Sequence, residues 1–421
     1  MSTGGAGGGD AVLSPERPAA APLPPHVDPA LSYDISRYFA STTDPDAYAA
    51  SANILEELPP VFYSNRRGGA AGQDGWFVTH YEDIREVYQN AELYSTYNLV
   101  NFQEMVGEHF LMLPLSIDPP EHGKYRVFLN PWFSPKAIKA LEPKITATVN
   151  GLIDSFADKG RCDVAYDFGR IYPVRVFMNL MGFPPERMDE FLQWEYALLH
   201  SQGDQQKVAW GIGSALRYLR AFIGEKKKAP LDETLTSYIA HGEIEGRPLT
   251  DDEIMGMVGF LWVGGLDTVA ATSALTFRRL ALDGELQAQL RANPDTHVEA
   301  IEEFLRLNPV VNSMRKVKKD HQIHGVTIRA GEYVTGLNIA GNYDPAEFEA
   351  PRTFRTDRPS NRHFSLAGGP HRCLGSHLAR RELRIALTEF LRRIPQFRLA
   401  PEADMTVTPG LVAAPRLPIV W

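Results

Sequence analysis

One cysteine has surroundings suited to metal chemistry. Cys373 lies in the segment Ala-Gly-Gly-Pro-His-Arg-Cys-Leu-Gly at residues 367–375, directly before an expected amphipathic helix. The unpaired N–H groups and the positive dipole end of a helix N-terminus favour thiolate over thiol, and thiolate is the form that binds metal. The chain has 2 cysteines, too few for a four-cysteine zinc site or an iron–sulfur cluster. A single thiolate suits an axial haem ligand, with a buried structural cysteine as the alternative.

A second candidate cluster consists of Gly264, Gly265, Asp267 and Thr268, in the middle of an expected long helix. Each glycine inside a helix costs about 1 kcal/mol relative to alanine, so we expect a compensating role. Without a Cβ, glycine lets a flat cofactor or a small molecule approach the backbone closely, and the acid and the alcohol would share that opening. A helix-packing notch with a solvent-facing aspartate is the alternative, and the sequence does not decide between the two.

The segment that carries this cluster, residues 254–275, is long and apolar enough for a transmembrane helix. Its centre contains Asp267, however, and a charge in the middle of a bilayer is costly. Thr250 and Glu253 precede it with the spacing of a capping box, which is typical of a helix that starts in water. We therefore expect a helix through the middle of a globular core, and no membrane association.

The composition is that of an ordinary globular protein, with 421 residues, 44% hydrophobic and 23% charged. A net charge of −9 argues against nucleic acid as the main partner. Two cysteines and no apolar signal segment indicate a reducing cytoplasm. Residues 1–28 are rich in Gly, Ala and Pro, and we predict a disordered tail there. No internal repeat or interior linker is visible, so residues 29–421 are expected to form one domain.

The elements that must position these residues are mostly helical. Helix periodicity is found at 136–157, 185–200, 208–227, 251–281, 296–307 and 375–394. Short strand-like runs are found at 75–79, 321–328, 332–336 and 417–421. The fold class predicted is mainly α with a small β region.

Four segments together resemble the cytochrome P-450 family of haem-thiolate monooxygenases, over about residues 34–421. They are the loop Gly369-x-His371-x-Cys373-x-Gly375, the helix bend at 264–268, the Glu303-x-x-Arg306 pair, and the run from Asn342 through Asp344, Pro345, Phe348, Pro351 and Phe354 to Arg358. Residues 263–269, 377–382 and 417–421 also resemble the bacterial camphor monooxygenase subfamily.

The resemblance implies a cytochrome P-450 fold with haem b held between the long central helix and the cysteine loop. Cys373 would be the axial ligand, and Gly264 and Gly265 would line the haem. Asp267 and Thr268 would be catalytic, supplying protons for oxygen activation. Binding of the haem propionates is implied for His122, Arg126, Arg315 and His371. A buried ion-pair network that supports the cysteine loop is implied for Glu303, Arg306 and Arg358.

Matching of positions predicts an apolar substrate pocket, although core packing is the alternative for each residue alone. Its candidates are Phe110, Met112, Phe260, Val263, Val311, Leu411 and Val412. Two departures from the family pattern occur. Leu366 and Ala367 stand where the haem loop usually opens with Phe and Gly, and Phe110 stands where the camphor enzyme presents a tyrosine to its substrate. Loss of that hydroxyl donor makes camphor itself a less favoured substrate.

We expect a monooxygenase that hydroxylates a small cyclic terpenoid or norisoprenoid of camphor, cineole or ionone size. No flavin or nicotinamide fingerprint follows a strand, so the resemblance implies a [2Fe–2S] ferredoxin and an NAD(P)H-dependent ferredoxin reductase. A basic docking patch for the ferredoxin is predicted from Lys124, Arg126, Arg358, Arg362 and Arg372. The alternatives are a peroxide-driven peroxygenase, which would not need Asp267 and Thr268, and a non-catalytic haem-based sensor.

Overall fold

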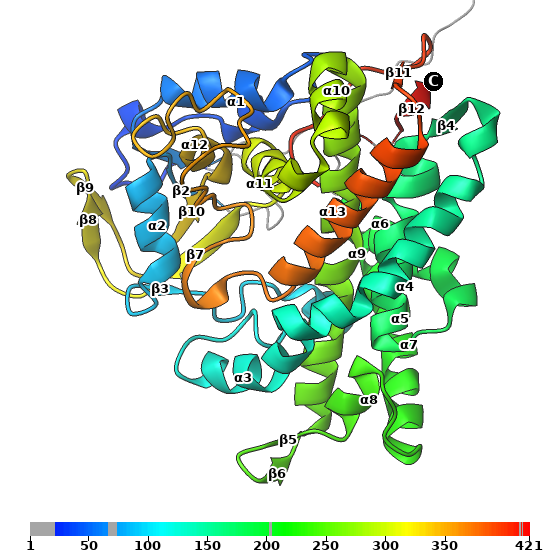
Figure 1. Cartoon of the computed structure of the whole chain (residues 1–421). Helices are drawn as coiled ribbons and strands as arrows, with labels where there is room; N and C mark the ends of the chain where they lie inside the picture. Colours follow the sequence, from blue (N-terminus) through cyan, green and yellow to red (C-terminus); the bar gives the residue numbers. More distant parts are fainter. Residues whose placement is uncertain (1–21, 66–73, 202–203, 412–413, 415) are drawn as a thin grey trace, which may run out of the picture.

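The computed structural model describes residues 22–65, 74–201, 204–411, 414 and 416–421. The long helix α9 (Asp251–Leu282) runs through the middle, with most of the other helices on one side and the main sheet on the other (Figure 1). The other α-helices are α1 (Ala47–Glu56), α2 (Tyr81–Gln89), α3 (Glu121–Phe133), α4 (Pro135–Asp154), α5 (Ile171–Met181), α6 (Met188–His200), α7 (Gln205–Lys228), α8 (Leu235–Ala240), α10 (Gly284–Ala292), α11 (His297–Leu307), α12 (Asn338–Asn342) and α13 (Ser376–Arg393).

The strands form two small sheets and two hairpins. The five-stranded sheet has the order β1 (Val61–Ser64), β2 (Gly75–Val78), β10 (Tyr333–Gly336), β7 (Ser313–Val317), β3 (Tyr94–Ser95). Only its β2–β10 pair is parallel. The second sheet has three strands in the order β11 (Arg398–Leu399), β12 (Pro418–Val420), β4 (Arg161–Asp163). One hairpin joins β5 (Glu243–Ile244) to β6 (Arg247–Pro248), and the other joins β8 (His321–Ile323) to β9 (Val326–Ile328).

The predicted fold class, mainly α with a small β region, is confirmed. The six expected helices are α4, α6, α7, α9, α11 and α13, and their ends agree within three residues. The remaining α-helices, α5 among them, were not predicted. In α5 only Arg175 and Asn179, one turn apart, are exposed, so the polar positions are too few to reveal a helical period.

Helix α9 begins as its capping box predicts. The Thr250 side chain accepts from the Glu253 N–H, and the Glu253 carboxylate accepts from the Thr250 N–H at 2.7 Å. Length and hydropathy alone would allow α9 to cross a membrane, but 67% of its most apolar window is buried inside the protein. This burial is that of a core helix.

The structure corrects the boundary of the predicted N-terminal tail. Val27 is buried in a cluster with Val61 and Trp76, and His26 Nε2 lies 2.7 Å from Glu332 Oε1. Residues 22–28 therefore pack on the domain, whereas residues 1–21 of the predicted tail lie outside the described residues.

Candidate active site

The loop that carries Cys373 is folded back on α2 and closed by a backbone hydrogen bond. The Cys373 N–H donates to the Leu366 carbonyl at 2.9 Å. Gly369 has φ +63°, and a Cβ built there would lie 2.2 Å from the Tyr88 carbonyl oxygen. Only glycine combines this backbone conformation with so close an approach, so Gly369 fixes the path of the loop in front of α13.

Ala367 is the strained residue of this loop. Its φ is +56°, in the left-handed region that costs an L-residue with a Cβ roughly 1–2 kcal/mol. The departure from the family pattern at this position thus has a defined physical consequence: alanine occupies a backbone conformation suited to glycine.

Burial, rather than the following helix, dominates the electrostatics of the Cys373 thiol. Desolvation raises its pKa, against the opposing effects of the Gly375 N–H, Arg126, Arg380 and Arg372. The N–H at the helix N-terminus does favour thiolate, as expected, but burial outweighs it because burial disfavours an uncompensated negative charge. A metal ligand must be deprotonated, so this sulfur suits a bound cation that offsets the cost of burial.

Two of the predicted propionate-binding residues are histidines whose rings lie against each other at an interplanar angle of 49°. The rings of His122, on α3, and His371, in the cysteine loop, lie 4.2 Å apart. Burial lowers the pKa of His122 to about 4 and that of His371 to about 3, so both are neutral hydrogen-bonding groups. Thr96 Oγ1, which the sequence did not single out, lies 3.1 Å from His371 Nε2.

The two other predicted propionate-binding residues are the arginines Arg126 and Arg315. Arg126 donates to the Arg372 carbonyl at 2.9 Å. Arg315, on β7, is buried, lies over the Tyr88 ring and donates to the Met314 carbonyl. No carboxylate of the described residues forms an ion pair with Arg315 at 4.0 Å or less. A buried guanidinium without a counter-ion is costly, and a propionate would supply one, so these residues fit the acidic edge of a haem.

The two central glycines of α9 have different surroundings. A Cβ at Gly264 would meet only the Phe260 ring, at 3.9 Å, so the backbone there is open. A Cβ at Gly265 would lie 2.5 Å from the Phe177 ring of α5. The sequence left two alternatives open, an opening for a bound group and a helix-packing notch, and each applies to one glycine. Gly264 is open to a bound group. Gly265 packs against α5, so the expectation that it also lines a cofactor is wrong because Phe177 occupies that space.

The predicted proton-relay residues lie on the same stretch of α9. Thr268 Oγ1 donates to the Gly264 carbonyl at 3.3 Å, beside the open position. The Asp267 carboxylate lies 2.8 Å from His200 Nε2, and Glu195 Oε1 lies 3.9 Å from the same nitrogen. His200 and Glu195 gave no sequence signal because only folding brings α6 onto this part of α9.

The apolar pocket candidates divide into two groups. Phe110 and Met112 are buried, and a Cβ at Gly259 of α9 would lie 3.9 Å from the Phe110 ring and 3.7 Å from Met112 Sδ. Phe260 and Val263 are partly buried next to them. Val311 and Leu411 are partly exposed, without a described contact to these four side chains, and Val412 lies outside the described residues.

The segment that carries Phe110 and Met112 is fastened to α9. Leu113 N–H donates to the Gly256 carbonyl at 3.2 Å, and a Cβ at Gly256 would lie 2.2 Å from the Leu111 carbonyl oxygen. On its other side, the buried Gln103 amide donates to the Phe110 carbonyl at 2.7 Å. The absence of a Cβ at Gly256 therefore allows this segment to lie against the helix.

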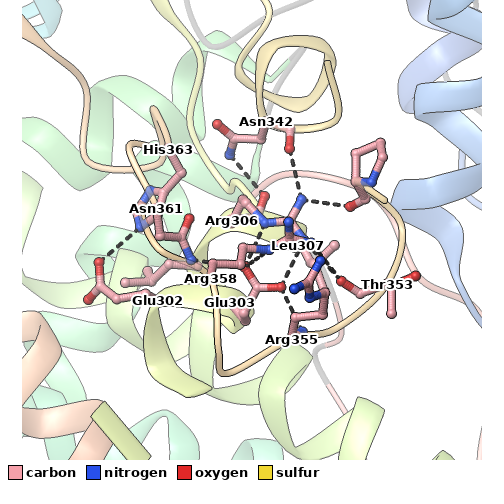
Figure 2. Close-up of polar contacts among 12 residues, drawn as sticks. Glu302, Glu303, Arg306, Leu307, Asn342, Thr353, Arg355, Arg358, Asn361 and His363 are labelled. Atoms are coloured by element: carbon pink, nitrogen blue, oxygen red, sulfur yellow. Dashed lines mark hydrogen bonds and ion pairs between the residues drawn. The ribbon is translucent and has the colours of Figure 1, made fainter. Parts of the chain in front are cut away.

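The predicted ion-pair network is present and buried (Figure 2). Arg306 Nε and Nη2 donate to the two Glu303 oxygens at 2.7 and 2.9 Å, and Arg358 Nε donates to Glu303 at 3.0 Å. Glu303 also accepts from Asn361 Nδ2 at 2.9 Å and from the Arg355 N–H at 3.0 Å. Five donors thus converge on one fully buried carboxylate.

A second ion pair, which the sequence did not reveal, ties α11 to α13. Glu302 accepts two hydrogen bonds from Arg380, at 2.6 and 2.8 Å. It also lies 3.3 Å from His363 Nε2 (Figure 2). Burial opposes ionisation of Glu302, but the hydrogen bonds from His363 and Arg380 prevail and lower its pKa to about 2. This pair braces the helix that follows Cys373.

The structure also corrects the predicted basic docking patch. The Arg358 side chain is 5% exposed and paired with Glu303, so it cannot contact a partner. Lys124 is paired with Glu121 and Glu245, and Arg362 with Glu347. Arg372 is exposed and has no ion pair within the described residues.

Three features together define a haem-thiolate protein: the partly buried Cys373 on a glycine-rich loop, imidazole and guanidinium donors without a carboxylate ion-pair partner among the described residues, and an open glycine on the long helix. Comparison with known proteins agrees. The family model described as Cytochrome P450 matches residues 188–412. The "Probable cytochrome P450 127A1" of Sinorhizobium fredii (strain NBRC 101917 / NGR234) is 37% identical over 92% of this chain and 94% of its own.

Two solved structures share the fold over nearly the whole chain. They are those of cytochrome P450 CYP101C1, with TM-score 0.83 and 32% identity, and of CYP101J2, with TM-score 0.82 and 29% identity. Each match covers 95% of this chain and 99% of the other. The chain belongs to the cytochrome P450 family, and the resemblance to its camphor-type subfamily is confirmed. It is therefore a haem-dependent monooxygenase, in which haem b lies between α9 and the cysteine loop with an axial cysteine thiolate.

Proposed function

We propose that this enzyme hydroxylates a small cyclic terpenoid or norisoprenoid of camphor, cineole or ionone size. The proposal rests on a group of apolar side chains near the open Gly264. Phe110 and Met112 pack against α9, next to Phe260 and Val263. None of these side chains offers a hydrogen-bond donor, so a compact hydrophobic substrate would be held by shape. The similarity to two CYP101 structures supports this size class.

The haem supplies oxygen activation, and the chain must supply protons beside it. We assign proton delivery to Asp267 and Thr268, because the Thr268 hydroxyl lies one helical turn beyond the open Gly264 and the Asp267 carboxylate is adjacent in sequence. Thr268→Ala should bind substrate normally but should divert reducing equivalents from product to peroxide. The measurement is product formed per NADH consumed, and an unchanged ratio would contradict the assignment.

For the electron supply, we propose a [2Fe–2S] ferredoxin with its NAD(P)H-dependent reductase, and a cytoplasmic location. The exposed Arg372 next to Cys373 would offer positive charge to an acidic partner. Arg372→Glu should then lower the rate of ferredoxin-dependent reduction, most strongly at low ionic strength. Reduction by dithionite, which needs no docking, is the control.

The test of substrate class is an optical titration of the purified haem protein against cyclic terpenoids. A low-spin to high-spin shift with one of them would support the proposal. A red-shifted reduced carbon-monoxide band without any terpenoid response would leave the chemistry but reject the substrate class. Turnover with peroxide alone, or none with ferredoxin and NADH, would favour a peroxygenase or a sensor.

A further inference from the structure

Three metal-ligating side chains converge where α6 packs on α9. They are Glu195, His200 and Asp267, whose nearest ligand atoms all lie within 4.8 Å of one another. His200 Nε2 lies 2.8 Å from Asp267 Oδ2 and 3.9 Å from Glu195 Oε1. The Tyr196 ring stacks on the His200 imidazole at 4.9 Å and 2°, which fixes the direction of the ring.

An ordinary His–Asp ion pair does not account for this cluster. Such a pair uses His200 Nε2 to donate to Asp267, but Glu195 Oε1 also lies 3.9 Å from the same nitrogen. This oxygen is buried and has no hydrogen-bond partner in the described part of the chain. Burial and the Asp267 charge raise the pKa of Glu195, and Arg170 only partly opposes them. Two carboxylates therefore share one imidazole, and a positive charge between them would satisfy both.

We propose that Glu195, His200 and Asp267 form a binding site for a divalent cation of the zinc type. One imidazole nitrogen with carboxylate oxygens suits zinc, whereas calcium and magnesium prefer six or more oxygen ligands. Two ligand atoms about 2.1 Å from a tetrahedral zinc lie about 3.4 Å apart, between the two observed distances. The third pair, Glu195 and Asp267, lies within 4.8 Å, so the side chains must draw together to complete three protein ligands, with water as the fourth.

The site is within reach of solvent. The side chains of His200 and Asp267 are 10% and 15% exposed, and Glu195 is 5% exposed. His200 and Asp267 are therefore partly accessible to an ion from solvent, and Glu195 is the most buried of the three.

Bound zinc would inhibit the enzyme, an inference that rests on the proposed role of Asp267. A carboxylate that ligates a metal cannot accept and pass on protons, so turnover should fall as the site fills. Zinc would then be a reversible inhibitor that acts beside the haem pocket without competing with substrate for it.

The experiment measures Zn²⁺ binding to the haem-loaded enzyme by equilibrium dialysis with metal analysis. A second group, His80, Asp83 and His324, lies at the surface and could also hold a cation. His324→Asn is therefore introduced first, as a common background. In that background we expect one equivalent of bound Zn²⁺, weakened at least tenfold by either Glu195→Gln or His200→Asn, and not displaced by millimolar Mg²⁺.

Absence of saturable binding in the His324→Asn enzyme, or binding unchanged by both further substitutions, would overturn the site. The haem spectrum and thermal midpoint of each variant establish that it is folded, and two different variants guard against one that is not. Inhibition is measured separately, as NADH consumption against Zn²⁺ concentration, with His200→Asn expected to be at least tenfold less sensitive. Binding without inhibition would reject the Asp267 inference alone, and failure to find a terpenoid substrate would leave the binding result intact.

Discussion

Glu303→Gln tests whether the buried network holds the cysteine loop. In the folded protein the Glu303 carboxylate accepts hydrogen bonds from two guanidinium groups, one amide and one backbone N–H. Glutamine keeps the shape, but it removes the only charge that balances Arg306 and Arg358 in this network, and it turns an NH₂ group toward donors. Leaving buried charge unpaired costs about 3–5 kcal/mol, which corresponds to a loss of more than roughly 100-fold in the ratio of folded to unfolded protein.

The effect should extend to the haem site through an identifiable chain of contacts. Arg306 donates to the Asn342 carbonyl, and Asn342 Oδ1 accepts from the Phe364 N–H at 2.8 Å. The Phe364 carbonyl in turn accepts from the Ala367 N–H at 2.7 Å, at the start of the cysteine loop. We therefore expect Glu303→Gln to weaken haem retention, together with the thiolate-type reduced carbon-monoxide band.

The assay is denaturant unfolding, with Glu56→Gln as the matched control. Glu56 pairs with Arg352 at 2.6 Å, but the two side chains are 47% and 40% exposed. The same chemical change in such an exposed pair should cost under about 1 kcal/mol. If Glu303→Gln destabilises the protein no more than Glu56→Gln, and haem is retained, the reasoning is refuted.

Four further substitutions test other parts of the site. Ala367→Gly should relieve the left-handed strain and, after the entropy cost of glycine, raise the free energy of unfolding by roughly 0.5–1 kcal/mol; a lower thermal midpoint would contradict this. Gly265→Ala should destabilise by roughly 1–3 kcal/mol through overpacking against Phe177, whereas Gly264→Ala should leave thermal stability intact but reduce substrate affinity in optical titrations. Glu302→Gln tests the pH dependence: because its folded pKa, about 2, lies below the ordinary 4.5, its stabilisation is present above pH 4.5 and is lost as pH falls toward 2. The wild-type advantage over this variant, about 2 kcal/mol at pH 7, should therefore shrink in unfolding curves recorded from pH 5 to pH 3, and a constant difference would exclude the pair as its source.

The sequence by itself determined the elements whose signals are local. The Thr250 capping box and a continuous helical period marked α9, and the glycine-rich spacing around Cys373 marked the haem loop, because caps, turns and periodicity depend on neighbouring residues. The pairing of Glu303 with Arg306 was also readable, since residues three apart lie on one helix face.

Only the tertiary structure decided which of these residues meet across the chain. It divided the two glycines, leaving Gly264 open and placing Phe177 against Gly265. It buried Arg358 away from any docking surface, and it brought His200 onto Asp267. Contacts of this kind join residues far apart in sequence, and they depend on how whole helices pack. No local pattern of side chains specifies that packing. The sequence could therefore single out some of these residues as candidates, but it could not predict which of them are in contact.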